Sequence, residues 1–252
     1  MAIMRSWDSF DYKSLDLNSF YSTADSLGFD DDTGIRFRGV TYDDAIYMQG
    51  FVAGFDNSLE FYGSGIAISG DHIVAGTFNA MANWFYDTSD DAWFYNLALT
   101  GFSVAATTVE AALISAGTAD DRAVLAKALS GHDNIVLSAD ADRMTGFAGN
   151  DTLRGGGDDD ALQGGVGHDR LNGESGDDWL RGEADNDLLR GGAGADGGVR
   201  ISFTMPEGLG KWRFLGFAHD AAMRYGSLDG ETITCQAKHT LNGYKLMWRG
   251  YT

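Results

Sequence analysis

The sequence has almost no cysteine, almost no proline and no long apolar run. Its single cysteine, Cys235, cannot form an internal disulfide, so no disulfide framework stabilises the chain. One proline stands beside 35 glycines, which favours tight turns in ordered structure over a collagen-like chain or a proline-rich linker. No run of about 18 apolar residues occurs, so we expect no transmembrane segment, and the first residues lack the apolar run of a cleaved secretion signal.

Basic residues are also scarce. The chain has 18 lysines and arginines against 37 acidic residues, a net charge of −19. Such a balance argues against nucleic acid as a partner and favours cations. With 44% hydrophobic residues, 12% of the chain being aromatic, the 252 residues are sufficient for the core of one large or two modest domains.

Residues 1–127 are rich in aromatic residues and predict a β-rich N-terminal domain. Apolar alternation indicates strands within 35–42, 65–80 and 92–100. In the last of these, four side chains are expected on one face of the strand: Trp93, Tyr95, Leu97 and Leu99.

Two short helices are expected at the end of this domain. Thr107 and Thr118 each precede an acid by three residues, Glu110 and Asp121, which is the pattern of an N-terminal capping box. The sequence therefore predicts a helical cap at 107–129, next to the segment that follows.

Residues 128–199 contain a nine-residue repeat. An aspartate recurs at every ninth position, as Asp133, Asp142, Asp151, Asp160, Asp169, Asp178, Asp187 and Asp196. Two residues after each of the first seven comes an apolar side chain, namely Ile135, Met144, Leu153, Leu162, Leu171, Leu180 and Leu189. Only the last block departs from the pattern, with Gly198.

A nine-residue unit with one large apolar side chain cannot fold alone, because it has too little to bury. If two units form one coil, the apolar residues of successive coils stack into an internal ladder. The aspartates then stack too, and their carboxylates repel one another unless a cation lies between them. Carboxylate and carbonyl oxygens at turns suit Ca²⁺. The predicted fold class is mainly β, with the N-terminal domain followed by a parallel β-roll.

Three blocks carry a resemblance to a known family. GFAGNDTLR (146–154), GGVGHDRLN (164–172) and GESGDDWLR (173–181) resemble the nonapeptide of RTX proteins, the hemolysin-type calcium-binding repeat. The resemblance implies a parallel β-roll with Ca²⁺ as its cofactor, and an extracellular protein. It also implies secretion machinery as a partner, in the form of a one-step ATP-driven channel that needs no cleaved signal.

The resemblance further implies which residues hold calcium, because in the family each ion is shared by turns two repeats apart. Asp169 would share one ion with Asp151 and another with Asp187, while Asp178 serves the opposite edge. The fourth position of each block is normally glycine, and the residue at this position distinguishes the two edges. The implied metal-site residues are Asp133, Asp151, Asp160, Asp169, Asp178, Asp187, Asp196, Gly149, Gly167 and Gly176.

The fourth position differs between the two edges. Glycine occupies it at 131, 149 and 167 on the first edge, whereas the second edge begins with Asp140 and Asp158. Aspartate adopts left-handed backbone less readily than glycine. We therefore expect the first edge to bind calcium more tightly.

Residues 200–252 change in composition, with seven bases against four acids. The family usually ends in a β-rich cap and an acidic or apolar export signal, and the basic ending KLMWRGYT departs from that. Two interpretations stay open: a capping module, or a tail replaced by a change of reading frame.

The N-terminal domain shows no recognisable active site. It has no His-Glu-x-x-His helix and no Gly-x-Ser-x-Gly elbow. The acid pairs Asp43–Asp44 and Asp90–Asp91 would point to opposite faces of a strand, so we interpret them as solvated turn residues. We expect a non-enzymatic binding, adhesion or structural domain, with a cell-surface or polysaccharide target as the candidate partner.

Two alternatives for this domain stay open. RTX rolls are often fused to hydrolases or sugar-modifying enzymes, so the domain could hold an unrecognised active site. It also faintly resembles secreted haem carriers, in which case Tyr47, Tyr62 and His72 are the candidate ligands of haem or another small molecule.

Overall fold

A computed structural model describes residues 1–52, 55–185 and 187–193, and the backbone of four later strands at 198–203, 212–214, 233–238 and 245–250. The chain divides into two compact units. The first comprises Met1–Trp7 and Lys13–Ala128, and the second comprises Asp8–Tyr12 and the chain from Leu129 onward. Among the described residues, no helix is long and apolar enough to cross a membrane.

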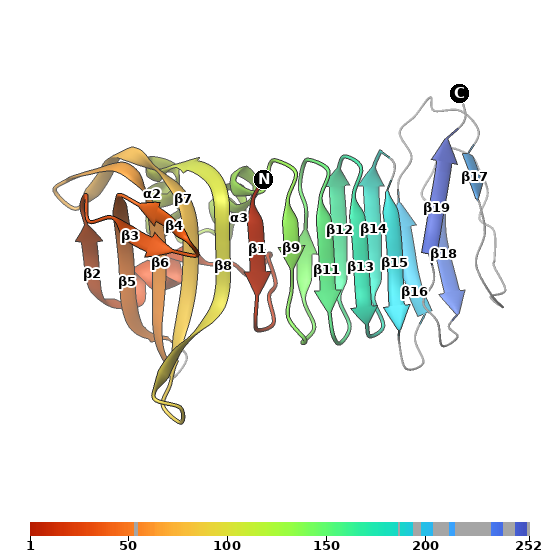
Figure 1. Ribbon diagram of the computed structural model, residues 1–252, viewed down its shortest axis with the longest axis horizontal. Coiled ribbons are helices and arrows are strands. Elements are labelled where there is room, and N and C mark those ends of the chain that lie inside the picture. The colour runs from red at the N-terminus through yellow and green to blue at the C-terminus, as the bar shows by residue number, and fades with distance from the viewer. Residues whose placement is uncertain are drawn as a thin grey trace. The chain divides into compact units, whose positions relative to one another are not determined.

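The first unit is a six-stranded antiparallel sheet with three short helices (Figure 1). Its strand order is β1-β8-β7-β6-β5-β2. Helix α1 packs against β5, α2 against β7 and β8, and α3 against β8. The elements are β1 (Ile3–Ser6), α1 (Leu17–Thr23), β2 (Ala24–Asp30), β3 (Ile35–Phe37), β4 (Val40–Tyr42), β5 (Asp44–Val52), β6 (Phe55–Ser69), β7 (His72–Asp87), β8 (Ala92–Ala105), α2 (Ala106–Ile114) and α3 (Thr118–Ala128).

A short hairpin of β3 and β4 covers part of one sheet face. Phe37 and Tyr42 of the hairpin are buried together with Tyr62 and a set of sheet alanines. The rings of Phe37 and Tyr62 stack with centroids 4.6 Å apart. Alanine in the strands leaves room for the large rings, so the aromatic residues predicted to build the core do so on this face.

The prediction for β8 is wrong in one respect, because its four apolar side chains do not share a face. The register of β7 against β8 shifts between the pairs Asn83–Leu97 and Trp84–Tyr95, which marks an irregularity at Asn96. As a result, Tyr95 packs against the same cluster as Ala98 instead of lining up with Leu97.

The predicted N-cap of the first helix is also wrong. Helix α2 begins at Ala106, its N-cap is Ala105, and no side chain caps it. Glu110 instead accepts a hydrogen bond from the backbone N–H of Ile73, at 2.9 Å. The Glu110 carboxylate, which the capping pattern assigned to the N-terminus of the helix, thus makes a tertiary contact instead.

The second unit contains a parallel β-solenoid of about three turns, which confirms the predicted fold class (Figure 1). One parallel sheet has the order β15-β13-β11-β9 and the other the order β10-β12-β14-β16. Residue partners lie one coil apart, as in Thr152 with Asn134 and Arg170. The strands are β9 (Asn134–Val136), β10 (Arg143–Thr145), β11 (Thr152–Gly156), β12 (Ala161–Val166), β13 (Arg170–Ser175), β14 (Trp179–Ala184), β15 (Leu188–Ala193), β16 (Gly198–Phe203), β17 (Trp212–Phe214), β18 (Ile233–Lys238) and β19 (Lys245–Gly250).

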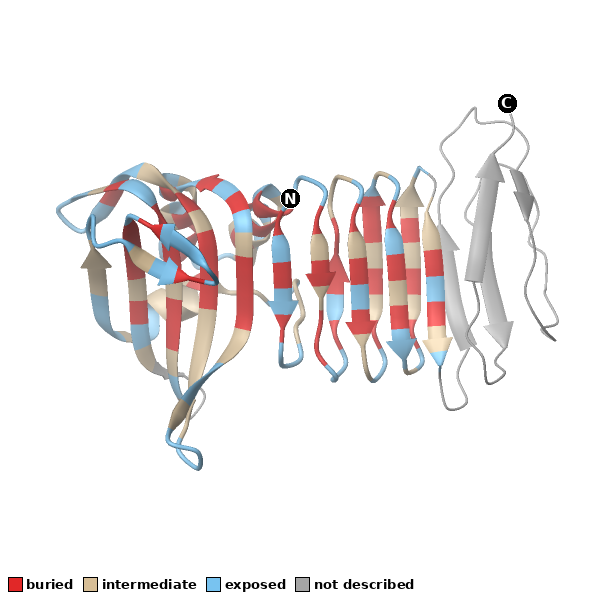
Figure 2. Cartoon of the chain, viewed as in Figure 1, coloured by how far each residue is buried: buried red, intermediate tan, exposed pale blue. Residues whose placement is uncertain are grey.

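The apolar residues of the repeat form the core of the roll, as predicted. All seven are at most 3% exposed: Ile135, Met144, Leu153, Leu162, Leu171, Leu180 and Leu189. Figure 2 shows regular buried bands along the strands of this unit, in line with the burial of these seven side chains. Their neighbours in the strands point outward because side chains alternate along a strand.

The edge strand β10 has a backbone partner within the second unit. The N–H of Arg143 donates to the carbonyl oxygen of Phe10 at 2.7 Å, and the N–H of Tyr12 donates to the carbonyl oxygen of Arg143 at 3.1 Å. The segment Asp8–Tyr12 therefore satisfies backbone groups that an open solenoid edge would expose.

We expect Leu171→Ala to destabilise the calcium-loaded roll by about 2–5 kcal/mol, because it removes most of a side chain that is only 1% exposed. Val166→Ala is the matched control, since Val166 lies on β12 with 58% of its surface exposed. Urea unfolding in saturating calcium measures both. A similar small change in the two variants would contradict the assignment of the leucine ladder as the core.

Candidate metal centre

The aspartates at the sixth position of each block form two rows along the roll. In each row, one carboxylate oxygen accepts the backbone N–H of the aspartate 18 residues earlier. The first row joins Asp151 to Asp133 (2.7 Å), Asp169 to Asp151 (2.8 Å) and Asp187 to Asp169 (2.9 Å). The second joins Asp160 to Asp142 (2.8 Å) and Asp178 to Asp160 (3.0 Å). The structure thus brings together the aspartates that the repeat spacing pairs.

The second carboxylate oxygen in these rows is buried without a hydrogen-bond donor among the described residues. This holds for Oδ2 of Asp151, Asp160, Asp169 and Asp178, whose residues are at most 2% exposed. Burying a carboxylate oxygen without a donor is costly, and a bound cation removes that cost. The buried carboxylates therefore fit a metal ion.

From the third to the seventh block, the glycine at the first position lies directly against this oxygen. A Cβ added at Gly146 would lie 2.5 Å from Oδ2 of Asp151 and 2.6 Å from the carbonyl oxygen of Gly164, one coil further on. The same two kinds of oxygen face Gly155, Gly164 and Gly173. Carboxylate and carbonyl oxygens converge at each of these glycines, and an all-oxygen set is what a hard cation such as Ca²⁺ prefers.

Comparison with protein families supports the same ion. The family model of the RTX calcium-binding nonapeptide repeat (4 copies) matches residues 128–162 and 163–197. This segment consists of RTX repeats. Because RTX repeats bind calcium, the predicted cofactor is confirmed. No curated protein and no solved structure shows a match to the chain.

Burial raises the pKa of five sixth-position aspartates of the RTX roll, and neighbouring carboxylates add to the effect. The pKa rises from 3.8 to about 6 for Asp169, about 7 for Asp151, Asp178 and Asp187, and about 8 for Asp160. Calcium binds the ionised carboxylate. A cation held by these carboxylates would therefore compete with protons near neutral pH.

From the third to the seventh block the fourth position adopts left-handed backbone, which suits glycine. Gly149, Gly167 and Gly176 have φ between 127° and 130°, while Asp158 and Asp185 adopt 59° and 74°. A Cβ at Gly149 would also run into the carbonyl oxygen of Gly131. These three glycines therefore make turns that place successive coils in close contact, whereas their part in the metal site stays a prediction.

Asp142 differs from the aspartates that follow it in its row. One carboxylate oxygen accepts the N–H of Phe10, and the other accepts the N–H and the hydroxyl of Ser138, both at 2.8 Å. Protein donors thus satisfy this carboxylate at the start of the row. At the other end, Asp196 lies outside the described residues.

The fifth position forms a further ladder that the sequence analysis missed. The N–H of Asn150 donates to Nδ1 of His132 (2.6 Å), and the N–H of His168 donates to Oδ1 of Asn150 (2.8 Å). On the other edge, the N–H of Asp177 donates to Oδ1 of Asp159 (2.6 Å). The signal was present, because six of the eight blocks have histidine, asparagine or aspartate at this position.

The strand register sets His72 apart from the other two candidate haem ligands, because His72 is paired with Ser69 at the turn between β6 and β7, whereas Tyr62 is paired with Ala80. Tyr62 is buried and its hydroxyl donates to Glu60, a carboxylate that also accepts the indole N–H of Trp84 at 3.0 Å. His72 is exposed, and its Nδ1 lies 3.0 Å from Glu110 of α2. Tyr47 lies on β5, opposite Glu60. Tyr62 and His72 thus each contact a carboxylate of the first unit.

The interpretation of Asp44 as a solvated turn residue is wrong. Asp44 is 2% exposed, and its carboxylate accepts the N–H of Ile66 at 2.7 Å and that of Asp32 at 3.3 Å. These bonds join the loop after β2 to β6. Asp90 and Asp91 are exposed in the turn between β7 and β8, as predicted.

We expect Gly149→Ala to weaken calcium-induced folding by about 1–3 kcal/mol or more, because alanine tolerates a φ of 130° poorly and its Cβ meets the carbonyl oxygen of Gly131. Gly131→Ala is the control at the same repeat position. Its backbone is not left-handed, and its added Cβ would have only Asp133 Oδ1 within contact, at 3.8 Å. Calcium titration followed by circular dichroism should separate the two variants, and equal effects would refute the structural distinction.

The raised pKa values predict opposite pH dependences with and without calcium. A carboxyl with a higher pKa when folded than when unfolded stabilises the metal-free fold fully only below about pH 4, and this contribution is lost as the pH rises through about 6 to 8. Calcium stabilisation needs the ionised form and grows over the same range. Amide exchange of residues 151–189 at pH 5 and pH 8.5 should show the metal-free roll better protected at pH 5. Equal protection at both pH values without calcium would contradict this.

Proposed function

We propose that the chain is an exported calcium-binding protein whose RTX roll folds when it meets calcium outside the cell. The supporting observation is the row of buried carboxylates whose second oxygen faces carbonyl oxygens and no hydrogen-bond donor among the described residues. RTX repeat proteins are typically exported. Because metal binding stabilises only the folded state, a calcium-rich exterior drives folding that low cytoplasmic calcium does not support.

The ions would be held by aspartates of neighbouring coils. Asp169 serves two ions, one with Asp151 and one with Asp187, while Asp133 begins the row and serves one. On the other edge, Asp160 and Asp178 share an ion, and Asp178 shares a second with Asp196. Calcium supplies the positive charge that the stacked carboxylates require, and the first-edge glycines allow the coils to approach.

In this proposal the N-terminal domain, residues 1–127, acts as a binding, adhesion or structural module without catalysis. Its candidate side chains are engaged in structural contacts, as with Asp44 at the backbone of Ile66. Residues 200–252 serve as a capping module in this proposal, since β18 pairs with β16 and β19 pairs with β15.

Calcium titration of the full chain tests the proposal. We expect circular dichroism to gain β signal on adding calcium but not equimolar magnesium, whose stricter octahedral geometry suits shared turns less well. Asp169→Ala should lower calcium stoichiometry or cooperativity in calorimetry more than Asp133→Ala. Asp169→Asn should resemble Asp169→Ala, because it keeps an acceptor for the N–H of Asp151 but loses the charge.

Two results would contradict the proposal. An unchanged spectrum at millimolar calcium would exclude calcium-driven folding. Equal effects of the substitutions at 169 and 133 would exclude the sharing of ions between coils, even if calcium still bound.

A further inference from the structure

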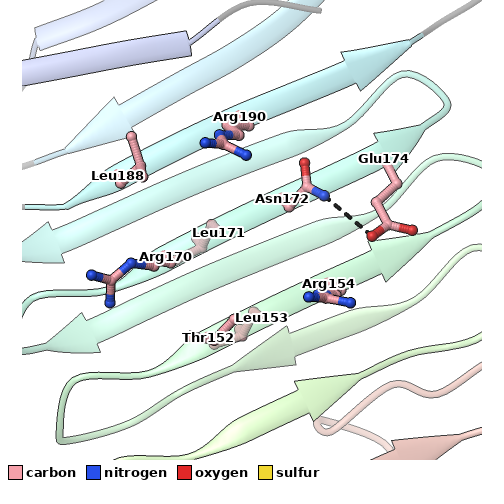
Figure 3. Close-up of a pocket in the computed structure, with 9 residues that line it drawn as sticks. All are labelled: Thr152, Leu153, Arg154, Arg170, Leu171, Asn172, Glu174, Leu188 and Arg190. Atoms are coloured by element: carbon pink, nitrogen blue, oxygen red, sulfur yellow. Dashed lines mark hydrogen bonds between the residues drawn. The ribbon is translucent and has the colours of Figure 1, made fainter.

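The outer face of one sheet of the RTX roll carries a shallow groove of about 420 Å³. Its lining comes from β11, β13 and β15, and six of its nine residues are at the block positions on either side of the buried leucine (Figure 3). Side chains alternate along a strand, so these positions point away from the core. Three of the lining residues are arginines, namely Arg154, Arg170 and Arg190.

The arginines of the roll divide between its two sheets in an unexpected way. Residues 128–199 contain 15 acids and five arginines. On the second sheet, Arg143 forms an ion pair with Asp11 (3.3 Å) and Arg181 forms one with Glu183 (3.4 Å). Across the described part of the chain, the three groove arginines form no ion pair. The three groove guanidinium groups are therefore available for a ligand, although the segment is rich in acidic residues.

The strand register sets the arrangement of these arginines. Arg154 is in register with Asn172, and Asn172 with Arg190, so the two arginines lie two strands apart on one line. Neighbouring strands are about 4.8 Å apart, which separates their backbones by roughly 10 Å. Arg170 lies on the middle strand, in register with Thr152 and Leu188. The charges are thus spread over an elongated area.

The groove also holds polar groups of the opposite kind. The side-chain amide of Asn172 donates to Glu174 at 3.2 Å, as the dashed line in Figure 3 marks. Glu174 accepts hydrogen bonds and repels a dense polyanion such as nucleic acid, which the net charge of −19 also disfavours. Hydroxyl groups are suitable donors to Glu174, and carboxylates or sulfates are suitable partners for the guanidinium forks.

We propose that this arginine groove (Arg154, Arg170, Asn172, Glu174 and Arg190) binds an acidic polysaccharide. Such a chain presents anionic groups and hydroxyls in alternation along an extended backbone, which matches separated guanidinium groups with a carboxylate and an amide between them. Arg154 and Arg190 bind acidic groups of sugars on either side of Asn172, and Arg170 binds a third group beside them.

The binding depends on calcium without using it as a contact, and here the inference rests on the proposed function. The groove residues belong to three successive coils, and no coil forms the groove alone. None of the groove residues is among the proposed calcium ligands. Stacking of the coils by calcium therefore assembles the sugar site.

Two double variants of the full chain that remove equal charge test the groove. Arg154→Gln with Arg190→Gln removes two of the three groove arginines, and Arg143→Gln with Arg181→Gln removes the two ion-paired arginines of the other sheet. Calorimetry in calcium-containing buffer with a tetramer of galacturonate measures binding. We expect the groove variant to bind at least about tenfold more weakly, and the control variant to stay within about twofold of the unchanged chain. Maltotetraose, which has no charge, should not bind.

Several results would overturn the proposal that the groove binds an acidic polysaccharide. Equal losses in the two double variants would assign binding to overall charge. Tighter binding of inorganic phosphate or of a short oligonucleotide than of the galacturonate tetramer would refute a sugar ligand. Circular dichroism of each sample separates this inference from the proposed function: no binding by a chain that folds with calcium refutes the groove alone, whereas a chain that does not respond to calcium refutes the proposed function.

Discussion

The buried carboxylate at the sixth position of each block is the group on which the RTX roll depends. One oxygen of Asp169 accepts the N–H of Asp151, which fixes the spacing of 18 residues between coils. The other oxygen lies against the first glycine of its own block, Gly164, where any Cβ would collide with it. The same carboxylate therefore dictates a glycine, a hydrogen bond between coils and the need for a cation.

The leucine ladder alone is too small to hold the coils. One leucine in each nine-residue block buries little apolar surface compared with the conformational entropy lost when that block is ordered. Hydrogen bonds between coils offset only part of this cost. In our proposal, a cation that also removes the repulsion between stacked carboxylates supplies the remaining stabilisation.

The repeat region could be predicted from the sequence because one constraint recurs in every block. The residues equivalent to Asp151 and Leu153 have the same environment in successive blocks, so the residue type at a block position predicts where that residue lies in the roll. In the first unit no position repeats, and single events decide the structure. An irregularity at Asn96 moves Tyr95 to the face opposite to the one expected, and alternation of apolar residues on both sides conceals it. Likewise, Glu110 accepts a hydrogen bond from the backbone N–H of Ile73, although the local sequence pattern favours a role for Glu110 in helix capping.

The same repeat leaves some positions free, and those are where this chain can differ from other rolls. Structural constraints determine the residue types at four positions. Close contacts determine the first, left-handed turns the fourth, carboxylate stacking the sixth and core packing the eighth. The seventh and ninth positions point outward from the strands, and their residue types vary. The seventh position is Thr152 in one block and Leu188 in another, and the ninth is Asn172 in one and Arg190 in another. A solenoid therefore separates two tasks in space, since its turns hold ions and its faces present side chains in register across coils. Any ligand that spans several coils on such a face senses whether the turns are loaded, because the distances between its contacts exist only in the stacked roll.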